Sequence, residues 1–279
     1  MFIVRIMPLE DHAGDVIAKS RKMKGIAVTA VAASAGLSAA ELAAYEEDGI
    51  LKTELQWASV AELLDLDGSK LKRVAQGWVP PLPNLSDWRE FRQITTTGPT
   101  MDVHAYLVWD EATKDAAIFD TGFDPQPIFD IIEAEGLNPL YLFITHMHGD
   151  HVAGLQAIRS RFPKIGLRSD SRGAPAQCRN RRDEFLLIGN LRVSNRDTPG
   201  HAEDGVTYVI GGFPDTAPSI AIVGDAIFAG SMGGAPVAGE LAKSKVREQI
   251  MTLPDDTLLG PGHGPLTCVG SEKENNPFF

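Results

Sequence analysis

The sequence predicts a layered α/β fold preceded by a small all-helical domain, and three observations carry this prediction. Residues 24–77 are rich in alanine and leucine and lack strand-like alternation, which favours helices. A proline-rich stretch at residues 78–94 is typical of a linker. Short apolar runs then alternate with helical patterns, as in α/β domains. We therefore expect a helical domain at residues 1–77 and an α/β domain at residues 95–279.

The helical part carries two patterns in which a serine precedes a glutamate by three residues, at Ser38 and Ser59. In such a pattern the serine caps a helix and the glutamate reaches back, so each serine predicts a helix start. Residues 31–38 predict a helix, a turn at Gly36 and a second helix. This arrangement resembles the helix-turn-helix of phage-repressor-like regulators.

The charges of the second predicted helix argue against binding to DNA. A DNA-reading helix needs basic or amide side chains, whereas the helix after Ser38 carries no lysine or arginine and four acidic residues: Glu41, Glu46, Glu47 and Asp48. The feature that favours DNA is a basic cluster upstream, which a solvated helix face would also explain: Lys19, Arg21, Lys22 and Lys24. We expect these helices to pack on the larger domain, to cover its rim or to form a homodimer.

The α/β part is predicted element by element. Residues 105–109 and 116–119 indicate two strands of a hairpin. Asp124 and Pro125 then begin a helix that ends near Gly136. Residues 140–144 form an apolar run typical of a buried strand.

The segment that leaves this strand, residues 145–151, reads Thr-His-Met-His-Gly-Asp-His. It places four candidate metal ligands within six residues: His146, His148, Asp150 and His151. Imidazole and carboxylate groups suit zinc, iron or manganese. Side chains two residues apart on a loop can converge on one ion while their neighbours reach a second.

Three more candidate ligands lie further along the chain, two of them after predicted strands. His201 lies in a turn after residues 191–193, Asp225 follows the apolar run 219–224, and His263 lies between glycines. Glycine allows the backbone to approach a crowded centre. With the 145–151 segment, these residues supply five histidines and two aspartates. Together they predict a site for two metal ions.

These motifs resemble those of the metallo-beta-lactamase superfamily, whose pattern His-x-His-x-Asp-His is followed by His, Asp and His at strand ends. The resemblance covers residues 95–279. It implies an αββα sandwich, in which two sheets lie face to face with helices outside and the metals lie at one edge.

The resemblance also assigns roles to individual residues. It implies a first metal held by His146, His148 and His201, a second held by Asp150, His151 and His263, and Asp225 bridging the two. Asp120, which ends the strand at 116–119, matches a family aspartate that organises the site without binding metal; a plain strand-end turn is the alternative. Asp150 and Asp120 are thus the expected catalytic carboxylates. The implied cofactor is two divalent metal ions, with zinc favoured over iron or manganese.

Within the superfamily, the sequence resembles the glyoxalase II-like branch. The resemblance rests on four stretches: residues 224–231, 253–257, 262–267 and 276–278. It implies a hydrolase in which a hydroxide held between two metals attacks a carbonyl, with a thioester as the preferred substrate.

Two alternatives to the hydrolase stay open. The branch includes persulfide dioxygenases, and His146, His201 and Asp225 contain the two histidines and one carboxylate associated with mononuclear non-heme iron. The other alternative is a transcriptional regulator that senses a ligand through its metal domain. We favour the hydrolase over both.

The sequence departs from this branch where substrate is held. Residues 232–236 read Met-Gly-Gly-Ala-Pro, where the branch continues into Gly-Arg or Gly-Lys, and sixteen residues follow His263 in place of a long helical domain. Tyr208 or the arginines of residues 179–182 are candidates to orient substrate, although those arginines also fit a solvated surface. His104 is interpreted as a structural residue at a strand start.

Composition sets the remaining expectations. The chain has 279 residues, 43% of them hydrophobic and 23% charged, as in an ordinary globular protein. A net charge of −11 repels nucleic acid. Two cysteines, Cys178 and Cys268, offer no disulfide framework, and no apolar run approaches the roughly 20 residues of a membrane span. We expect a cytoplasmic enzyme with a small-molecule substrate and no nucleic-acid or membrane partner.

Overall fold

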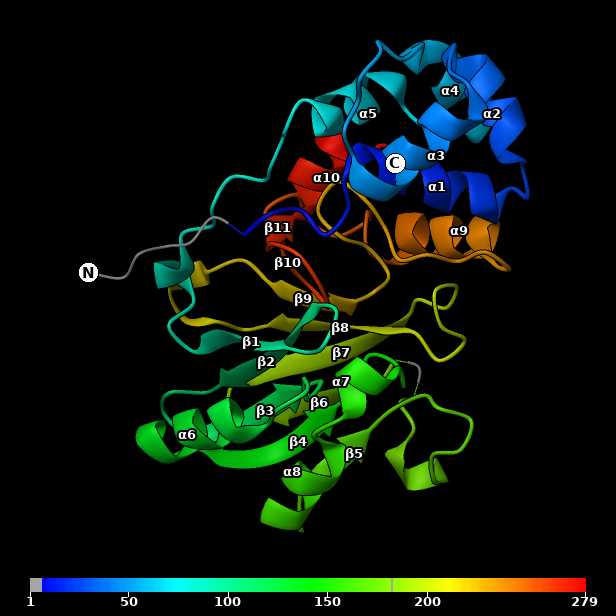
Figure 1. Cartoon of the computed structure of the whole chain (residues 1–279). Helices are drawn as coiled ribbons and strands as arrows, with labels where there is room; N and C mark the ends of the chain where they lie inside the picture. The colour runs from blue at the N-terminus through cyan, green and yellow to red at the C-terminus, as the bar shows by residue number, and fades with distance from the viewer. Residues whose placement is uncertain (1–6, 182) are drawn as a thin grey trace.

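The computed structural model of the protein describes residues 7–181 and 183–279. Two β-sheets lie face to face, helices cover both outer surfaces, and the N-terminal helices lie against the helices that cover one of the sheets (Figure 1). The predicted fold class, an α/β sandwich with a small helical region before it, is confirmed.

The N-terminal region is helical in its described part. Its helices are α1 (Ala13–Met23), α2 (Val28–Ala35), α3 (Ala39–Asp48), α4 (Trp57–Leu64) and α5 (Gly68–Ala75). Ser38 and Glu41 form a capping box at the start of α3, as predicted, and Gly36 ends α2 with φ 74°. The axes of α2 and α3 differ by 97°, a value within the range of helix-turn-helix pairs.

The second predicted helix start is wrong. Ser59 lies inside α4, which begins at Trp57 after the N-cap residue Gln56. Trp57, Val60 and Leu64 share one face of α4 and pack in the helical core. Because this apolar face already includes Trp57, the helix extends two residues upstream of the serine.

Two members of the basic cluster on α1 are engaged in ion pairs. Lys19 contacts Asp11 with Nζ 2.5 Å from Oδ2, and Arg21 contacts Glu46 with Nη2 2.7 Å from Oε2. The interpretation as a solvated face is therefore wrong for Lys19 and Arg21. The other two lysines of the cluster, at positions 22 and 24, are exposed.

The first sheet has the strand order β1-β2-β3-β4-β5. Its strands are β1 (Phe91–Thr97), β2 (Asp102–Trp109), β3 (Asp115–Phe119), β4 (Asn138–Phe143) and β5 (Gly166–Arg168). Strands β2 and β3 form the predicted hairpin. Helix α6 (Gln126–Glu135) follows Pro125 and ends at Gly136, as predicted, and α8 (Leu155–Arg161) lies beside it on the outer face (Figure 1).

The second sheet has the order β11-β10-β9-β8-β7-β6. Its strands are β6 (Phe185–Ile188), β7 (Leu191–Asp197), β8 (Val206–Gly211), β9 (Ile220–Gly224), β10 (Leu258–Pro261) and β11 (Thr267–Cys268). Two helices cover its outer face, α9 (Gly239–Gln249) and α10 (Val269–Asn275) (Figure 1). The described residues also contain three short 3-10 turns: η1 (Leu85–Asp87), η2 (Ala176–Cys178) and η3 (Pro214–Thr216).

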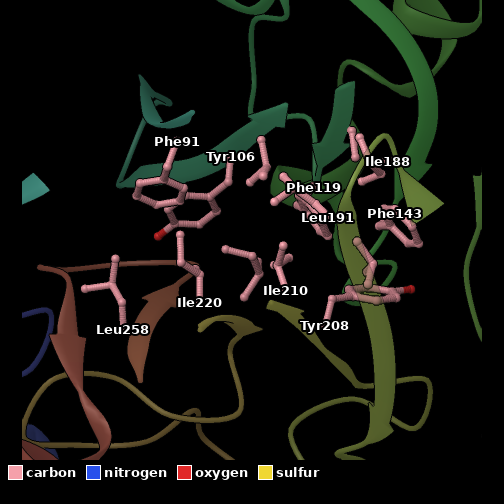
Figure 2. Close-up of a cluster of buried hydrophobic side chains, with 14 of the residues drawn as sticks. Phe91, Tyr106, Phe119, Phe143, Ile188, Leu191, Tyr208, Ile210, Ile220 and Leu258 are labelled. Atoms are coloured by element: carbon pink, nitrogen blue, oxygen red, sulfur yellow. The ribbon is translucent and has the colours of Figure 1, made fainter. Parts of the chain in front are cut away.

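A single apolar core fills the space between the two sheets. Figure 2 shows side chains of the first sheet, such as Phe91, Phe119 and Phe143, facing Ile210 and Ile220 of the second. All five are at most 2% exposed. This burial fixes the faces of both sheets, and so the strand ends that carry the candidate ligands are held in one place.

A second core joins the N-terminal helices to the sandwich. Helix residues such as Ile17 and Leu64 pack in one cluster with residues from the far end of the chain: Met232, Ala235, Ala242 and Phe278. At the edge of this cluster, Lys243 of α9 contacts Asp65 with Nζ 2.6 Å from Oδ2. The N-terminal helices are thus packed on the sandwich, one of the roles expected from their alanine-rich surface.

No single helix in the described part of the chain has both the length and the apolar character of a membrane span. The pair α2 and α3 meets them jointly, but with a 97° bend between its members.

Candidate metal centre

The segment after β4 brings its candidate ligands together through a short helix. Helix α7 (Gly149–Val152) begins after His148, and the His151 N–H donates to the His148 carbonyl over 3.0 Å. This turn leaves the His146 and His148 rings adjacent, with Nε2 3.0 Å from Nδ1. Asp150 and His151 lie on the first turn of α7. The turn at the end of β4 therefore places His146 and His148 at one position, and Asp150 and His151 at a neighbouring position.

The other candidate ligands come from the facing ends of strands in the second sheet. Strands β9 and β10 are parallel, and Gly262 N–H donates to the Gly224 carbonyl over 2.9 Å. The next residue along each strand is a candidate ligand, Asp225 or His263. His201 lies in the connection from β7 to β8. Val206, at the end of that connection, donates to the Thr145 carbonyl over 2.9 Å and ties the two sheets together.

The first donor set contains His146, His148, His201 and Asp225. His201 Nε2 lies 3.0 Å from His148 Nδ1 and 3.4 Å from Asp225 Oδ2. One ligand atom from each member lies within 4.8 Å of the others. This spacing matches atoms gathered around one ion, because two ligands of a tetrahedral ion are about 3–4 Å apart.

The second donor set contains Asp150, His151 and His263. Asp150 Oδ2 lies 3.2 Å from His263 Nε2 and 3.6 Å from His151 Nε2. Asp225 joins the two sets: its Oδ1 lies 3.3 Å from His151 Nε2, and its Oδ2 lies 3.5 Å from His263 Nε2. The structure thus brings all seven predicted ligands into one cluster, divided as the family resemblance implies.

Two buried atoms in this cluster show that its donors fit metal ions. His151 Nε2 and Asp225 Oδ1 are buried, and neither forms a hydrogen bond within the described structure. An unpaired buried polar atom is costly. Nitrogen and carboxylate oxygen are ligands that zinc and iron accept. Metal coordination would therefore satisfy atoms that the protein leaves without partners.

The charges of the metal-free cluster are balanced by protons. Burial opposes the charged form of His151, but carboxylate neighbours, Asp120 first, outweigh it and raise its pKa to about 10. Burial also opposes charged His263, yet hydrogen bonds to carboxylates raise its pKa to about 11. Burial and the charge of His151 lower the pKa of His146 to about 2. Because metals bind neutral imidazole, metal binding must release the protons of His151 and His263.

Asp120 contacts the ligands from behind. Its carboxylate accepts hydrogen bonds from Thr145 N–H and Thr145 Oγ1, both at 2.7 Å, and lies 2.8 Å from His151 Nδ1. Asp120 is 1% exposed and has φ 54°. A carboxylate on the far nitrogen fixes the orientation of a ligating histidine. The geometry supports the organising role, and exceeds what a plain strand-end turn requires.

We expect Asp120→Asn to weaken metal binding at the second set by about 10–100-fold. The amide nitrogen of asparagine cannot accept the hydrogen bond from His151 Nδ1, so the histidine loses its fixed tautomer. Competition with a chelator measures the affinity. Asp130→Asn on the exposed face of α6 is the matched control; equal affinities in the two variants would contradict the role of Asp120.

Several glycines permit the close packing of this centre. A Cβ atom on Gly262 would lie 2.2 Å from Asp225 Oδ1, and one on Gly233 would lie 1.9 Å from the Asp225 carbonyl oxygen. The expectation that glycines beside His263 allow close approach is confirmed at Gly262. The same role of Gly233 was not predicted, although the pair Gly233-Gly234 in the sequence indicates a place where the backbone can pack closely. The next carbonyl, that of Gly234, lies 2.9 Å from His201 Nδ1.

His104 also supports the centre from behind. It is fully buried, its Nε2 lies 2.8 Å from the Gly264 carbonyl and its Nδ1 lies 3.0 Å from Thr95 Oγ1. Burial lowers its pKa to about 4, so it is neutral at physiological pH. The interpretation as a structural strand residue agrees with these contacts, and the loop that it holds is the one that carries His263.

The predicted substrate-orienting residues lie elsewhere. Tyr208 is fully buried between the sheets, and its hydroxyl donates to the Ile144 carbonyl over 3.0 Å. This role for Tyr208 is wrong, because its position in β8 faces the core. The Arg179 guanidinium donates to the carbonyls of Ala174 and Arg172 and so stabilises its own loop. Arg182 lies outside the described residues.

Comparison with known proteins decides the family. The model of the Metallo-beta-lactamase superfamily matches residues 98–263, more than half of the chain. The chain belongs to this superfamily. The match spans all seven candidate ligands, whereas the N-terminal helices lie outside it.

Individual relatives of this superfamily chain indicate the branch. It is 27% identical to hydroxyacylglutathione hydrolase GloC of Haemophilus influenzae, over 62% of this chain and 91% of the relative. It is 29% identical to the mitochondrial persulfide dioxygenase ETHE1 of Homo sapiens, over 64% of this chain and 72% of the relative. The crystal structure of ETHE1 from Myxococcus xanthus aligns with a TM-score of 0.58 at 26% identity, over 67% of this chain and 83% of that chain. The protein is therefore an enzyme of the glyoxalase II-like branch of this metallo-hydrolase superfamily.

Proposed function

We propose that this superfamily member is a dinuclear metal-dependent hydrolase that cleaves a thioester. The observation that carries the proposal is the second donor set, Asp150, His151 and His263, which is complete beside the first. Asp225 approaches both sets through its two oxygens. The similarity to hydroxyacylglutathione hydrolase GloC supports a thioester as substrate.

The two sets would hold two divalent ions, with zinc favoured over iron and manganese because the ligands are mostly imidazole. When bound, such a pair lowers the pKa of water toward about 7 and polarises a carbonyl group. The protein's own part is to fix the ligands. Asp120 orients His151, and the Gly234 carbonyl orients His201. A thioester suits this site because a thiolate leaves without a general acid.

The dioxygenase is a second candidate, favoured by the 29% identity to human ETHE1. It would need one iron at the first set, where His146, His201 and Asp225 supply two imidazoles and one carboxylate. Metal content separates the two candidates. About two metals per chain supports the hydrolase, whereas one iron, retained with excess zinc or iron, together with oxygen consumption on glutathione persulfide, would support the dioxygenase.

We expect the metal-loaded protein to hydrolyse at least one thioester at neutral pH, and His148→Ala to lower the rate by about 100-fold or more. The reason is that His148 lies 3.0 Å from both His146 and His201, at the centre of the first set. Release of thiol, followed with a thiol-reactive dye, measures the rate. Gln156→Ala on exposed α8 is the control, and a thioester panel left intact by the wild type would refute the assignment.

A further inference from the structure

The segment before α1 reaches the loop that carries His263. Gly264, the next residue, has φ 73°, and a Cβ atom there would lie 3.0 Å from Glu10 N and 3.2 Å from Glu10 Cβ. The Glu10 backbone therefore packs directly on this loop. Residues from the N-terminal region, outside the superfamily match, thus lie beside a candidate metal ligand.

Two neighbours of Glu10 hold this segment in place. Asp11 is 6% exposed and accepts a hydrogen bond from Lys19 of α1. Lys19 Nζ also donates to the Met232 carbonyl over 3.0 Å and lies 4.9 Å from the centre of the Phe228 ring. Phe228 in turn packs edge-on against His263, with ring centres 5.8 Å apart. The segment is therefore anchored to both loops that border the second donor set.

The carboxylate of Glu10 is not part of the ion pair between Asp11 and Lys19. Asp11 and Lys19 neutralise each other, whereas Glu10 is exposed and close enough to interact electrostatically with His263 and Asp225. The nearby residues 232–236, Met-Gly-Gly-Ala-Pro, add no positive charge. The packing of the Glu10 backbone on Gly264 thus holds an exposed carboxylate near the metal cluster.

Two arginines of the 170–181 loop, Arg172 and Arg179, interact with groups other than Glu10. The Arg172 guanidinium pairs with Glu203, with Nη2 3.1 Å from Oε2, two residues after His201. Arg179 donates to backbone carbonyls of its own loop. Arg172 and Arg179 are therefore already engaged.

We infer that Glu10 is a specificity-determining residue, which selects substrates whose thiol carrier bears an ammonium group and disfavours carriers that bear a carboxylate. The inference rests on the proposed thioester hydrolysis. An ammonium group near Glu10 is attracted, while a carboxylate is repelled, and a separation of several Å beside a partly buried surface leaves both effects substantial. The N-terminal region thereby supplies a substrate contact from outside the residues that match the superfamily.

The test uses acyl thioesters of three carriers: cysteamine, which is cationic, N-acetylcysteamine, which is neutral, and 3-mercaptopropionate, which is anionic. In the wild type we expect kcat/KM to be about 10-fold higher for the cationic than for the anionic carrier. This preference should disappear in Glu10→Gln and reverse in Glu10→Lys. The neutral carrier should change by less than about 2-fold, and the preference should shrink between about 20 and 500 mM salt. Glu47→Lys on the exposed face of α3 is the control of equal charge change.

A binding measurement separates this inference from the proposed function. Cysteamine and 3-mercaptopropionate are titrated into cobalt-loaded protein, and thiolate-to-cobalt absorption reports affinity without turnover. If thioesters are cleaved but Glu10→Lys and Glu47→Lys show equal preferences, the inference is overturned and the hydrolase stands. If no thioester is cleaved but Glu10→Lys reverses the thiol affinities, the hydrolase fails, while discrimination of thiols by the charge of Glu10 at the metal centre is retained. Circular dichroism of Glu10→Gln and Glu10→Lys checks that both fold.

Discussion

Replacing Asp225 with alanine is expected to remove both metals together and to lower the hydrolytic rate by about 1,000-fold. Asp225 Oδ1 lies 3.3 Å from His151 Nε2 in the second set, and its Oδ2 lies 3.4 Å from His201 Nε2 in the first. Its carboxylate also balances positive charge: burial disfavours its charged form, but the nearby His151 and His263 side chains outweigh burial and hold the pKa of Asp225 well below the usual range. The alanine variant therefore loses a shared ligand and a buried countercharge.

Elemental analysis of three variants distinguishes a ligand shared by both donor sets from a ligand that belongs to one set. Asp225→Ala should fall from about two metals per chain toward zero at limiting metal, whereas Asp150→Ala should keep the metal of the first set. His148→Ala should keep the metal of the second set. A variant Asp225→Ala that retains two tightly bound metals would show that Asp225 does not join the sets.

The candidate ligands were predictable because their placement follows from strand ends. His146, His148, Asp150 and His151 are neighbours in sequence, so local geometry alone brings them together. Asp225 and His263 follow strands β9 and β10, which are parallel and end at the same edge. The apolar run at residues 219–224 predicted β9, whereas β10 was not predicted as a strand and His263 was identified from the glycines around it.

Contacts between distant segments were not predictable in the same way. The pairing of Lys19 with the Met232 carbonyl joins residues 213 positions apart, and nothing in either local sequence specifies it. Tyr208 was misplaced because alternation along β8 gives two faces without saying which one meets the other sheet. Ser59 was misread because a capping pattern ignores the tertiary packing of Trp57.

Deleting residues 1–77 is expected to abolish activity and to cause aggregation. The deletion uncovers Met232, Ala235, Ala242 and Phe278, each at most 4% exposed, which pack against the N-terminal helices. It also removes the bond from Lys19 to the Met232 carbonyl. Two residues further on, the Gly234 carbonyl lies against His201, so loss of the helices loosens a metal ligand as well as exposing apolar surface.

A single substitution tests the same interface while the chain keeps its length. Ile17 is fully buried in the shared core, so Ile17→Asp places an unpaired carboxylate there and should destabilise the protein by about 3–5 kcal/mol. Lys22→Glu, on the exposed side of the same helix, should change stability by less than about 0.5 kcal/mol. Thermal unfolding and metal content provide the readouts; an active, well-folded 78–279 fragment would contradict the shared core.

The opposing expectation is that these helices read DNA, and their charge argues against it. The angle between α2 and α3 fits a helix-turn-helix pair, but α3 exposes Glu41, Glu47 and Asp48 and carries no lysine or arginine. Affinity for duplex DNA comes largely from counterions released by basic side chains, and α3 has none to offer. We therefore expect the intact protein not to bind random or genomic duplexes at about 150 mM salt. Tight binding that disappears on deletion of residues 1–77 would show instead that the helices form a DNA-binding domain, with the basic side chains of α1 outweighing the acidic face of α3.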